Sequence, residues 1–355
     1  MLAAVGLSAL LVTAGCAGSI AGLGADGDAA GPHLDSVPAS AEYVAYVDAA
    51  GMASDESLRS IANAALDART EYDDDAPADV DAVFEAAEND SGLDPTKVEA
   101  VTAFGTTPEN PMTDEASAAM VLATSYSEAD LVAAMENQGA EFSEETYGDA
   151  TLYVSERGSD YERVLAVLGD GEFAVGDRST VERVVDVRAG DADALGGDLK
   201  GAFEDTTDGY VRFAMAAPSG DASEAVASQA PMDASALQNV EYVSGSFATG
   251  DGNVTTTVSL VAASESDAQQ TYDLVDGVLS LYSSMDEGEF QDALDGVSVE
   301  QDGDTVTVAH TDTVENVESQ VEALYGFGAG SASVSGSASA SNSTSASIAP
   351  VAASE

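Results

Sequence analysis

The sequence predicts an α+β protein made of two tandem, pseudo-repeated units, each with a mainly antiparallel sheet and helices on one face. Throughout residues 38–327, segments in which apolar and polar residues alternate, as in strands, are followed by segments in which apolar residues recur at helical spacing. The same order of strand and helix segments recurs in both halves, which predicts units at residues 38–190 and 191–327. Hairpin signals at Asp170-Gly171 and at residues 250–253 favour antiparallel pairing.

The first unit is expected to contain several strands, joined by helices with recognisable start signals. Ser127 with Asp130, and Ser179 with Glu182, have the spacing of a capping box, and Gly139 is placed to end the helix that follows Ser127. The expected strands are residues 42–48, 98–105, 118–125, 151–155, 163–169 and 172–177, and the expected helices cover residues 58–66, 80–87, 127–138 and 179–185.

The second unit follows the same plan, with expected strands at residues 209–217, 240–249, 254–263, 297–300 and 304–310 and expected helices at 221–229, 268–282 and 312–325. If the plan is duplicated, the strand pair 98–105 with 118–125 is equivalent to the pair 240–249 with 254–263. The helices that begin near Ser127 and Ser264 should then lie on the same face of their two sheets.

Charge is the strongest feature of the composition. Ten Lys and Arg stand against 65 Asp and Glu, which gives a formal net charge of −55. This balance excludes a nucleic-acid partner and electrostatic adhesion to anionic lipid, since both need clustered basic residues. The acidic residues are spread along the chain rather than gathered in one tail, so we expect a whole surface adapted to high salt.

The N-terminal segment has the pattern of an export signal. An uncharged apolar run ends in Thr13-Ala14-Gly15-Cys16, after which small residues follow. This resembles a lipobox, in which Cys16, the one cysteine of the chain, carries a lipid. No Lys or Arg precedes the run, which leaves an uncleaved anchor helix as the alternative. Residues 1–16 are therefore expected to be a signal segment, 17–37 a flexible tether and 328–355 a disordered Ser/Ala/Gly tail.

Together, the lipobox and the acidic composition resemble the secreted lipoproteins of halophilic archaea. The resemblance implies export, a lipid tether at Cys16 and a position at the outer face of the cytoplasmic membrane. It supplies no catalytic residues.

Motifs for catalysis are absent from the sequence. His33 falls in the expected tether and His310 at a strand end, and no histidine pair has metal-binding spacing. The common serine-hydrolase signatures and the phosphate-binding loop are missing as well. We therefore expect no catalytic residue and no cofactor.

Two weaker signals remain. The acidic run that contains Asp73, Asp74 and Asp75 is a weak candidate for a Ca²⁺ site, with a solvated loop as the alternative. The run from Asp191 to Lys200 begins like a calcium-binding loop but lacks the required Glu at its twelfth position, so it is expected to be a solvated loop. Glycosylation sequons occur at Asn253, Asn342 and Asn89.

The expected function is therefore that of a lipid-anchored envelope protein that binds or scaffolds, with a ligand that no motif identifies. The alternative is an extracellular hydrolase that uses carboxylates or a bound cation. In either case we expect the site in the crevice between the two units, because ligand pockets favour such interfaces.

The acidic surface makes a prediction about salt. As the salt concentration falls from molar toward about 0.1 M, the Debye length grows from about 3 Å to about 10 Å, so the carboxylates repel one another again. Circular dichroism and the melting temperature should both show a loss of stability over this range. An unchanged melting temperature would contradict salt adaptation.

Overall fold

The computed structural model describes residues 31–70, 76–107, 117–155, 163–169, 171–217, 235–283, 294 and 296–331, with side chains of the final helix described as far as Glu322. Several residues singled out in the sequence lie outside this part of the chain: Cys16, Asp73, Asp74, Asp75 and Asn342. The same holds for the expected helix at residues 221–229.

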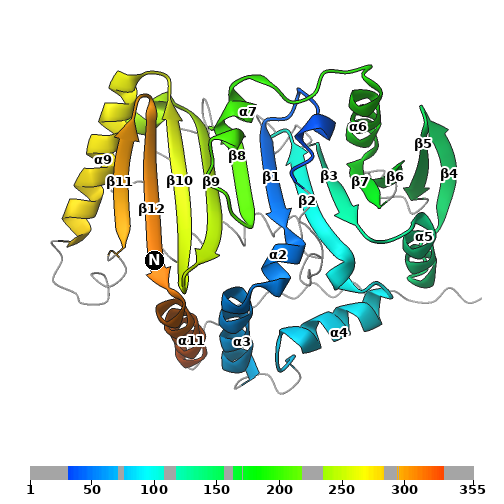
Figure 1. Ribbon diagram of the computed structural model, residues 1–355, viewed down its shortest axis with the longest axis horizontal. Helices are drawn as coiled ribbons and strands as arrows, with labels where there is room; N and C mark the ends of the chain where they lie inside the picture. The colour runs from blue at the N-terminus through cyan, green and yellow to red at the C-terminus, as the bar shows by residue number, and fades with distance from the viewer. Residues whose placement is uncertain are drawn as a thin grey trace, which may run out of the picture.

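The described chain is organised around one antiparallel sheet of 12 strands (Figure 1). The strand order is β11-β12-β10-β9-β8-β1-β2-β3-β7-β6-β5-β4. The strands are β1 (Tyr43–Asp48), β2 (Val98–Gly105), β3 (Ala118–Thr124), β4 (Phe142–Tyr147), β5 (Ala150–Ser155), β6 (Arg163–Gly169), β7 (Glu172–Asp177), β8 (Val211–Ala216), β9 (Val240–Gly250), β10 (Asn253–Ala262), β11 (Val297–Asp302) and β12 (Thr305–Thr313).

Helices lie between many of the strands in chain order. They are α2 (Ala49–Ser54), α3 (Glu56–Thr70), α4 (Val80–Ser91), α5 (Glu128–Asn137), α6 (Arg178–Ala189), α7 (Gly197–Glu204), α9 (Glu265–Ser283) and α11 (Val314–Ser331), with short 3₁₀ helices η1 (Leu34–Ser36), η2 (Pro95–Lys97) and η3 (Ser235–Asn239). In Figure 1, α3, α4 and α11 lie beyond the ends of the strands, where α11 packs on α3. The α+β class predicted from the sequence is confirmed.

The prediction of two separate sheets is wrong. β1 of the first unit pairs with β8 of the second, from Tyr43 opposite Met215 to Val47 opposite Val211. The two expected units therefore share one continuous hydrogen-bonded sheet. Each of these strands alone would be an edge with unpaired backbone groups, and joining them removes that edge.

The strand orders of the two halves agree when they are followed outward from this joint. One side runs β1-β2-β3-β7-β6 and the other β8-β9-β10-β12-β11, and the first half adds the hairpin β5-β4 at its edge. The pairs β2-β3 and β9-β10 occupy equivalent places, as expected. Duplication of one ancestral unit stays a prediction, since strand order alone does not test how well the halves superpose.

The two faces of the sheet are covered by different helices. Val164 and Ala166 of β6 belong to the main core cluster with α6, whereas Leu165 and the neighbouring Val167 belong to a second cluster with α5. Because successive side chains of a strand point to opposite faces, α5 and α6 lie on opposite sides. The expectation of helices on one face is therefore wrong.

The register also relates α5 to α9. Leu260 of β10 packs under α9 and is paired directly with Val243 of β9, which is in turn paired with Met215 of β8. Met215 is paired with Tyr43 of β1, and directly paired residues point to the same face of a sheet. Followed through β2, β3 and β7, this face is the one on which the α5 cluster lies. The helices that begin near Ser127 and Ser264 thus lie on one face, as predicted.

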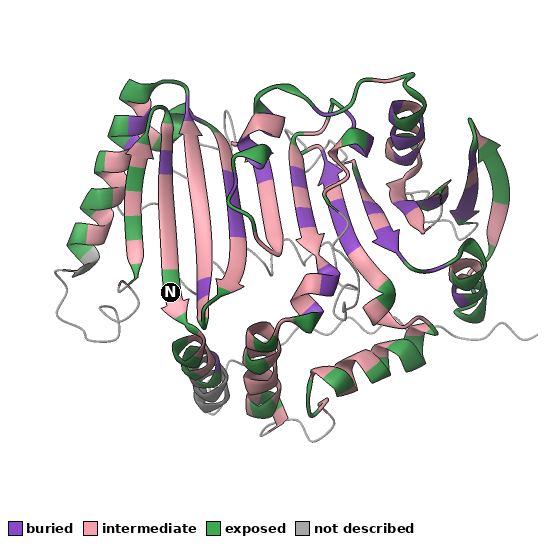
Figure 2. Cartoon of the chain, in the orientation of Figure 1, coloured by how far each residue is buried: buried purple, intermediate pink, exposed green. Residues whose placement is uncertain are grey.

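Burial is concentrated in the middle of the sheet and beneath α6, where Figure 2 shows most of the purple segments. The largest fully buried side chains include Phe104, Phe173, Phe203 and Leu152. Each such side chain contributes about 1.5–3 kcal/mol relative to an exposed position. The strands β10, β11 and β12 are mostly half-buried or exposed instead.

The helix-capping and turn signals in the sequence were correct where their residues make no other contact in the fold. The capping box at Ser127 and Asp130 is formed as predicted. The box expected at Ser179 is not, because α6 already begins at Arg178, and Asp177 before it accepts a hydrogen bond from the Ala118 amide (2.9 Å). The hairpin between β9 and β10 turns at Asp251 and Gly252, both with positive φ, as that tight turn requires.

Two boundaries also differ from the prediction. The edge strand β4 was missed because its sequence is largely polar, with Glu144 and Glu145 exposed. Charged residues on an edge strand discourage pairing with another chain. The expected tail begins too early, since α11 continues past residue 328 to Ser331.

Candidate functional site

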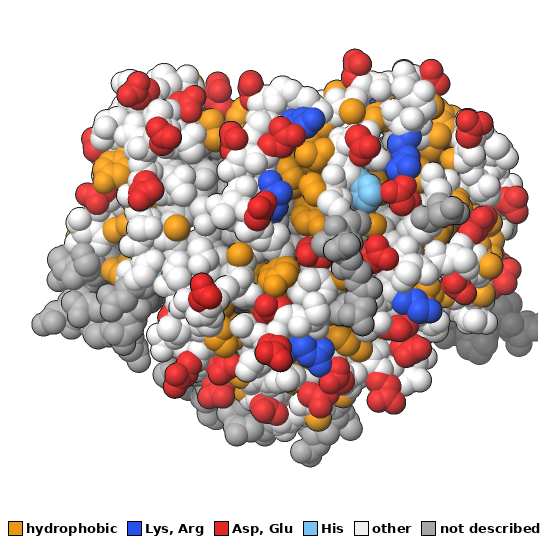
Figure 3. Space-filling model, in the orientation of Figure 1, with side chains coloured by type: hydrophobic (Ala, Val, Ile, Leu, Met, Phe, Trp, Pro, Cys, Tyr) orange, Lys and Arg blue, Asp and Glu red, His pale blue; other side chains and the backbone are white. Residues whose placement is uncertain are grey.

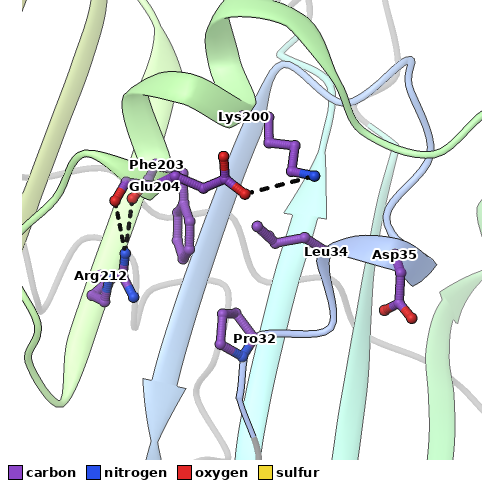
Figure 4. A pocket seen from close by; sticks show the side chains of 7 residues that line it. All are labelled: Pro32, Leu34, Asp35, Lys200, Phe203, Glu204 and Arg212. Carbon is purple, nitrogen blue, oxygen red and sulfur yellow. Dashed lines mark hydrogen bonds and ion pairs between the residues drawn. The ribbon is translucent and has the colours of Figure 1, made fainter.

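A hollow among the described residues lies over the joint between β1 and β8 (Figure 4). It has a volume of about 420 Å³ and is lined by Pro32, Leu34, Asp35, Lys200, Phe203, Glu204 and Arg212. One wall comes from the chain before β1 and the other from the start of the second half, so the hollow lies where the two expected units meet. In Figure 3 an orange patch of apolar side chains occupies the centre of this face, with blue side chains beside it.

The first wall is a short strap, residues 32–38, that crosses the sheet. Val37 is fully buried, Leu195 donates its amide to the Val37 carbonyl (2.7 Å), and Pro38 forms a bridge with Ala194. Arg188 of α6 donates to the Ser36 hydroxyl (3.3 Å). Residues 32–37 were predicted to be flexible tether, and this is wrong because Val37 and Ser36 anchor them in the core.

His33 belongs to the same strap. Its amide donates to the Thr102 hydroxyl (3.2 Å), and its Nδ1 lies 3.4 Å from the carboxylate of Glu172. Glu172 is also paired with Arg188 at 2.7 Å. His33 therefore holds the strap against β2 and β7, and its Nε2 is buried without a hydrogen-bond partner among the described residues.

The second wall is α7, which the sequence did not predict. The run from Asp191 to Lys200 was expected to be a solvated loop, but Leu195 and Leu199 are buried and its last residues start α7. This correction follows from the spacing of Leu195, Leu199 and Phe203, which places one apolar side on the sheet.

Arg212 fixes α7 to the sheet. It points from β8 to the end of α7, donating to the Thr206 hydroxyl (2.7 Å) and to the Phe203 carbonyl (3.1 Å). Its guanidinium lies 4.8 Å from the centre of the Phe203 ring, and its side chain is 14% exposed. A cation at the C-terminal end of a helix is favourable, because the last carbonyls carry partial negative charge.

Tyr46 of β1 stands directly opposite Arg212 in the pairing of β1 with β8. Burial, together with the negative charge of Asp48, raises the pKa of Tyr46 to about 12, although the positive charge of Arg212 opposes this shift. The phenol therefore stays protonated at neutral pH and cannot act as a base beside the hollow.

The remaining charged groups of the hollow are not arranged for acid–base catalysis. Lys200 and Glu204 are 3.6 Å apart, with side chains 39% and 57% exposed. In Figure 4 Asp35 points away from Glu204. A carboxyl group that serves as a general acid needs apolar surroundings that keep its proton at neutral pH, and Glu204 is instead exposed and ion-paired.

A second hollow of about 170 Å³ lies at the start of α6, where Ser179, Thr180 and Arg183 face Phe104 and Ala41. It is smaller and contains no carboxylate. We therefore take the hollow at the joint as the candidate site.

The residues singled out from the sequence do not gather at either hollow. His310 lies on β12, opposite Thr256 and Val297, and its Nε2 is buried without a hydrogen-bond partner. Asn253 lies beside the β9–β10 turn, and Asn89 is exposed near the end of α4. Among the residues that the structure describes, no group of three His, Cys, Asp or Glu could hold a metal ion.

The sequence reasoning missed Lys200, Phe203 and Arg212. A signal was present, since Arg212 interrupts an apolar strand sequence at a position that faces the core in alternation with Ala214. An arginine on the core-facing side of a strand needs carbonyl or carboxylate partners. Its presence therefore predicts a polar contact with the element that covers this face of the sheet. No helix within the described part of the chain is long and apolar enough to cross a bilayer.

Comparison with known proteins gives little guidance. No protein-family model matches the chain, and no curated protein sequence matches it. Three crystal forms of TP0453 are structurally similar over 84%, 83% and 84% of this chain and 99%, 98% and 97% of theirs, with TM-scores of 0.43, 0.41 and 0.42 and identities of 12%, 14% and 10%.

Proposed function

We propose that this chain is a lipid-anchored protein at the outer face of the cytoplasmic membrane of a halophile and that it acts by binding rather than by catalysis. The observation that carries the binding half of the proposal is the hollow over the β1–β8 joint. The lipid-anchor half rests on the lipobox-like sequence that ends in Cys16.

Binding is favoured over hydrolysis because the groups around the hollow are already engaged. Arg212 donates hydrogen bonds to the Thr206 hydroxyl and to the Phe203 and Glu204 carbonyls, and Glu204 is paired with Lys200. No two carboxylates face each other across the space in Figure 4. A hydrolase would need a carboxyl group held in its acid form opposite a second one.

The lining favours a small anion with an apolar part. Lys200 is partly exposed at the rim, and Pro32 and Leu34 offer apolar contact beside it. Lys200 could exchange its long contact with Glu204 for a closer one with a ligand carboxylate, since charge-assisted hydrogen bonds are shorter and stronger. Cations are scarce on this chain, with ten Lys and Arg in 355 residues, so the Lys200 ammonium, whose contact with Glu204 is as long as 3.6 Å, is the best anchor for an anion in this hollow.

This ligand class predicts a change in lysine reactivity. The chain has two lysines, Lys97 and Lys200, so Lys97 serves as an internal reference. Titration with small carboxylates, or with a small-molecule extract of the native envelope, should slow amine labelling of Lys200 saturably and leave Lys97 unchanged. Lys200→Met should weaken binding of the same probe by about tenfold or more, which corresponds to about 1.4 kcal/mol, and Lys97→Met should not. If no probe or extract protects Lys200, the hollow is not the ligand site.

The lipid anchor makes a separate prediction. Cys16→Ala should move the protein from the membrane fraction to the medium or leave its precursor unprocessed, whereas Ser19→Ala should leave it membrane-bound. Fractionation and mass spectrometry of the N-terminus measure both. Unmodified Cys16 in an uncleaved chain would contradict the lipid anchor and support the anchor helix.

A further inference from the structure

The second hollow, beside α6, brings together segments that are far apart in the sequence. Its lining comes from residues 38–41 before β1, from the end of β2 at residues 104–106, from Ser117 before β3 and from residues 179–183 of α6. It shares no lining residue with the hollow over the β1–β8 joint, so the two are separate sites.

Arg183 brings a positive charge to this hollow that no carboxylate neutralises. Its neighbours on the same helix are paired, Arg178 with Glu182 at 2.9 Å and Arg188 with Glu172 at 2.7 Å, whereas Arg183 has no ion pair or hydrogen bond with any described residue. The chain has 65 Asp and Glu against ten Lys and Arg, so partners for a cation are abundant. An arginine that lines a hollow and still lacks a carboxylate partner is available to an anion from solution.

The helix directs Arg183 toward hydroxyl groups. Residues three and four positions apart share one face of a helix, and their side chains lean toward its N-terminal end. Arg183 therefore extends over Thr180 and Ser179, which line the same hollow together with Ser40. None of these three hydroxyls has a hydrogen-bond partner in the part of the chain that the structure describes, so all three are free to donate.

The carboxylates that flank these segments in the sequence are engaged elsewhere. Asp177 accepts a hydrogen bond from the Ala118 amide (2.9 Å), and Glu42 accepts from the amide (2.7 Å) and the hydroxyl (2.8 Å) of Thr107. No carboxylate is among the described residues that line the hollow. An anion in it would therefore contact a guanidinium and hydroxyl groups, and salt would screen the more distant negative charges.

We propose that the second hollow binds a tetrahedral oxyanion of the phosphate type, held by the guanidinium of Arg183 and the hydroxyls of Ser40, Ser179 and Thr180. A guanidinium donates two parallel hydrogen bonds to phosphate oxygens, and each hydroxyl donates one more. The four oxygens of a phosphate can accept all of these bonds. The two oxygens of a carboxylate would both be taken by the arginine, which leaves the hydroxyls less well satisfied.

The size of the hollow fits one such group. Its volume of about 170 Å³ is below the roughly 300 Å³ at which pockets begin to enclose a whole drug-sized ligand. A free phosphate ion and the phosphate group of a larger molecule share the proposed chemistry. Ser40 and Ser179 are exposed, so the hollow is open to solvent on their side and leaves room for the rest of a larger molecule.

Titration with inorganic phosphate in molar sodium chloride tests the proposal on the full chain carrying Cys16→Ala, so that no lipid is attached. The amide NMR signals at the start of α6 should shift saturably, with a dissociation constant in the millimolar range, because one arginine supplies the charge and salt screens it. Phenyl phosphate should shift the same signals, and acetate should bind at least about tenfold more weakly than phosphate.

Variants of the arginine separate the contributions of charge and shape. Arg183→Gln should weaken phosphate binding by at least about tenfold. Arg183→Lys keeps the charge but loses the planar fork, so it should bind more weakly than the unsubstituted chain and more tightly than Arg183→Gln. Ser179→Ala should cause a smaller loss than Arg183→Gln. Arg59→Gln removes one positive charge on α3 and should leave phosphate binding unchanged.

Circular dichroism of each variant shows whether it has folded, and the exposed position of Arg183 makes unfolding a poor explanation of lost binding. The absence of a saturable shift with both phosphate and phenyl phosphate overturns the proposal. So does binding that Arg183→Gln leaves unchanged, or acetate that binds as tightly as phosphate. Tighter binding of phosphate than of phenyl phosphate supports a free ion as the ligand, and the reverse order supports a phosphorylated molecule.

Discussion

The pairing of β1 with β8 is the interaction on which the rest of the structure depends. These strands come from the two halves of the chain, and their hydrogen bonds turn two groups of strands into one sheet of 12. Without this pairing, both halves would expose an unpaired central edge. Its register also determines which side chains share a face, and so where every covering helix can pack.

The candidate site follows from this joint. The strap and α7 reach the sheet from different directions and meet over β1 and β8, and Arg212 ties α7 to β8 by its contacts with Phe203 and Thr206. The hollow is the space between the strap and α7. Farther from the joint, α9 covers the opposite face of the sheet, through Leu260 and Val306.

The elements of the fold could largely be predicted from the sequence, because alternation and hairpin turns act locally. β2, for example, has the predicted bounds. The pairing of β1 with β8 could not be predicted, because neither strand's own sequence indicates which strand will lie beside it. The capping box at Ser179 failed for a similar reason, since Asp177 is engaged by a distant strand. The strap and α7 were missed because Val37, Leu195 and Leu199 gain their burial only from long-range packing. For the same reason the residues that line the candidate hollow were not predicted, although a site between the halves was expected.

Differential scanning calorimetry in molar salt tests the central claim, that one continuous sheet couples the two halves. The account predicts a single transition whose calorimetric enthalpy equals its van't Hoff enthalpy, because neither half can lose its strands without exposing the edge of the other. Two resolved transitions, or a calorimetric enthalpy near twice the van't Hoff value, would contradict it and show that the halves unfold as independent units.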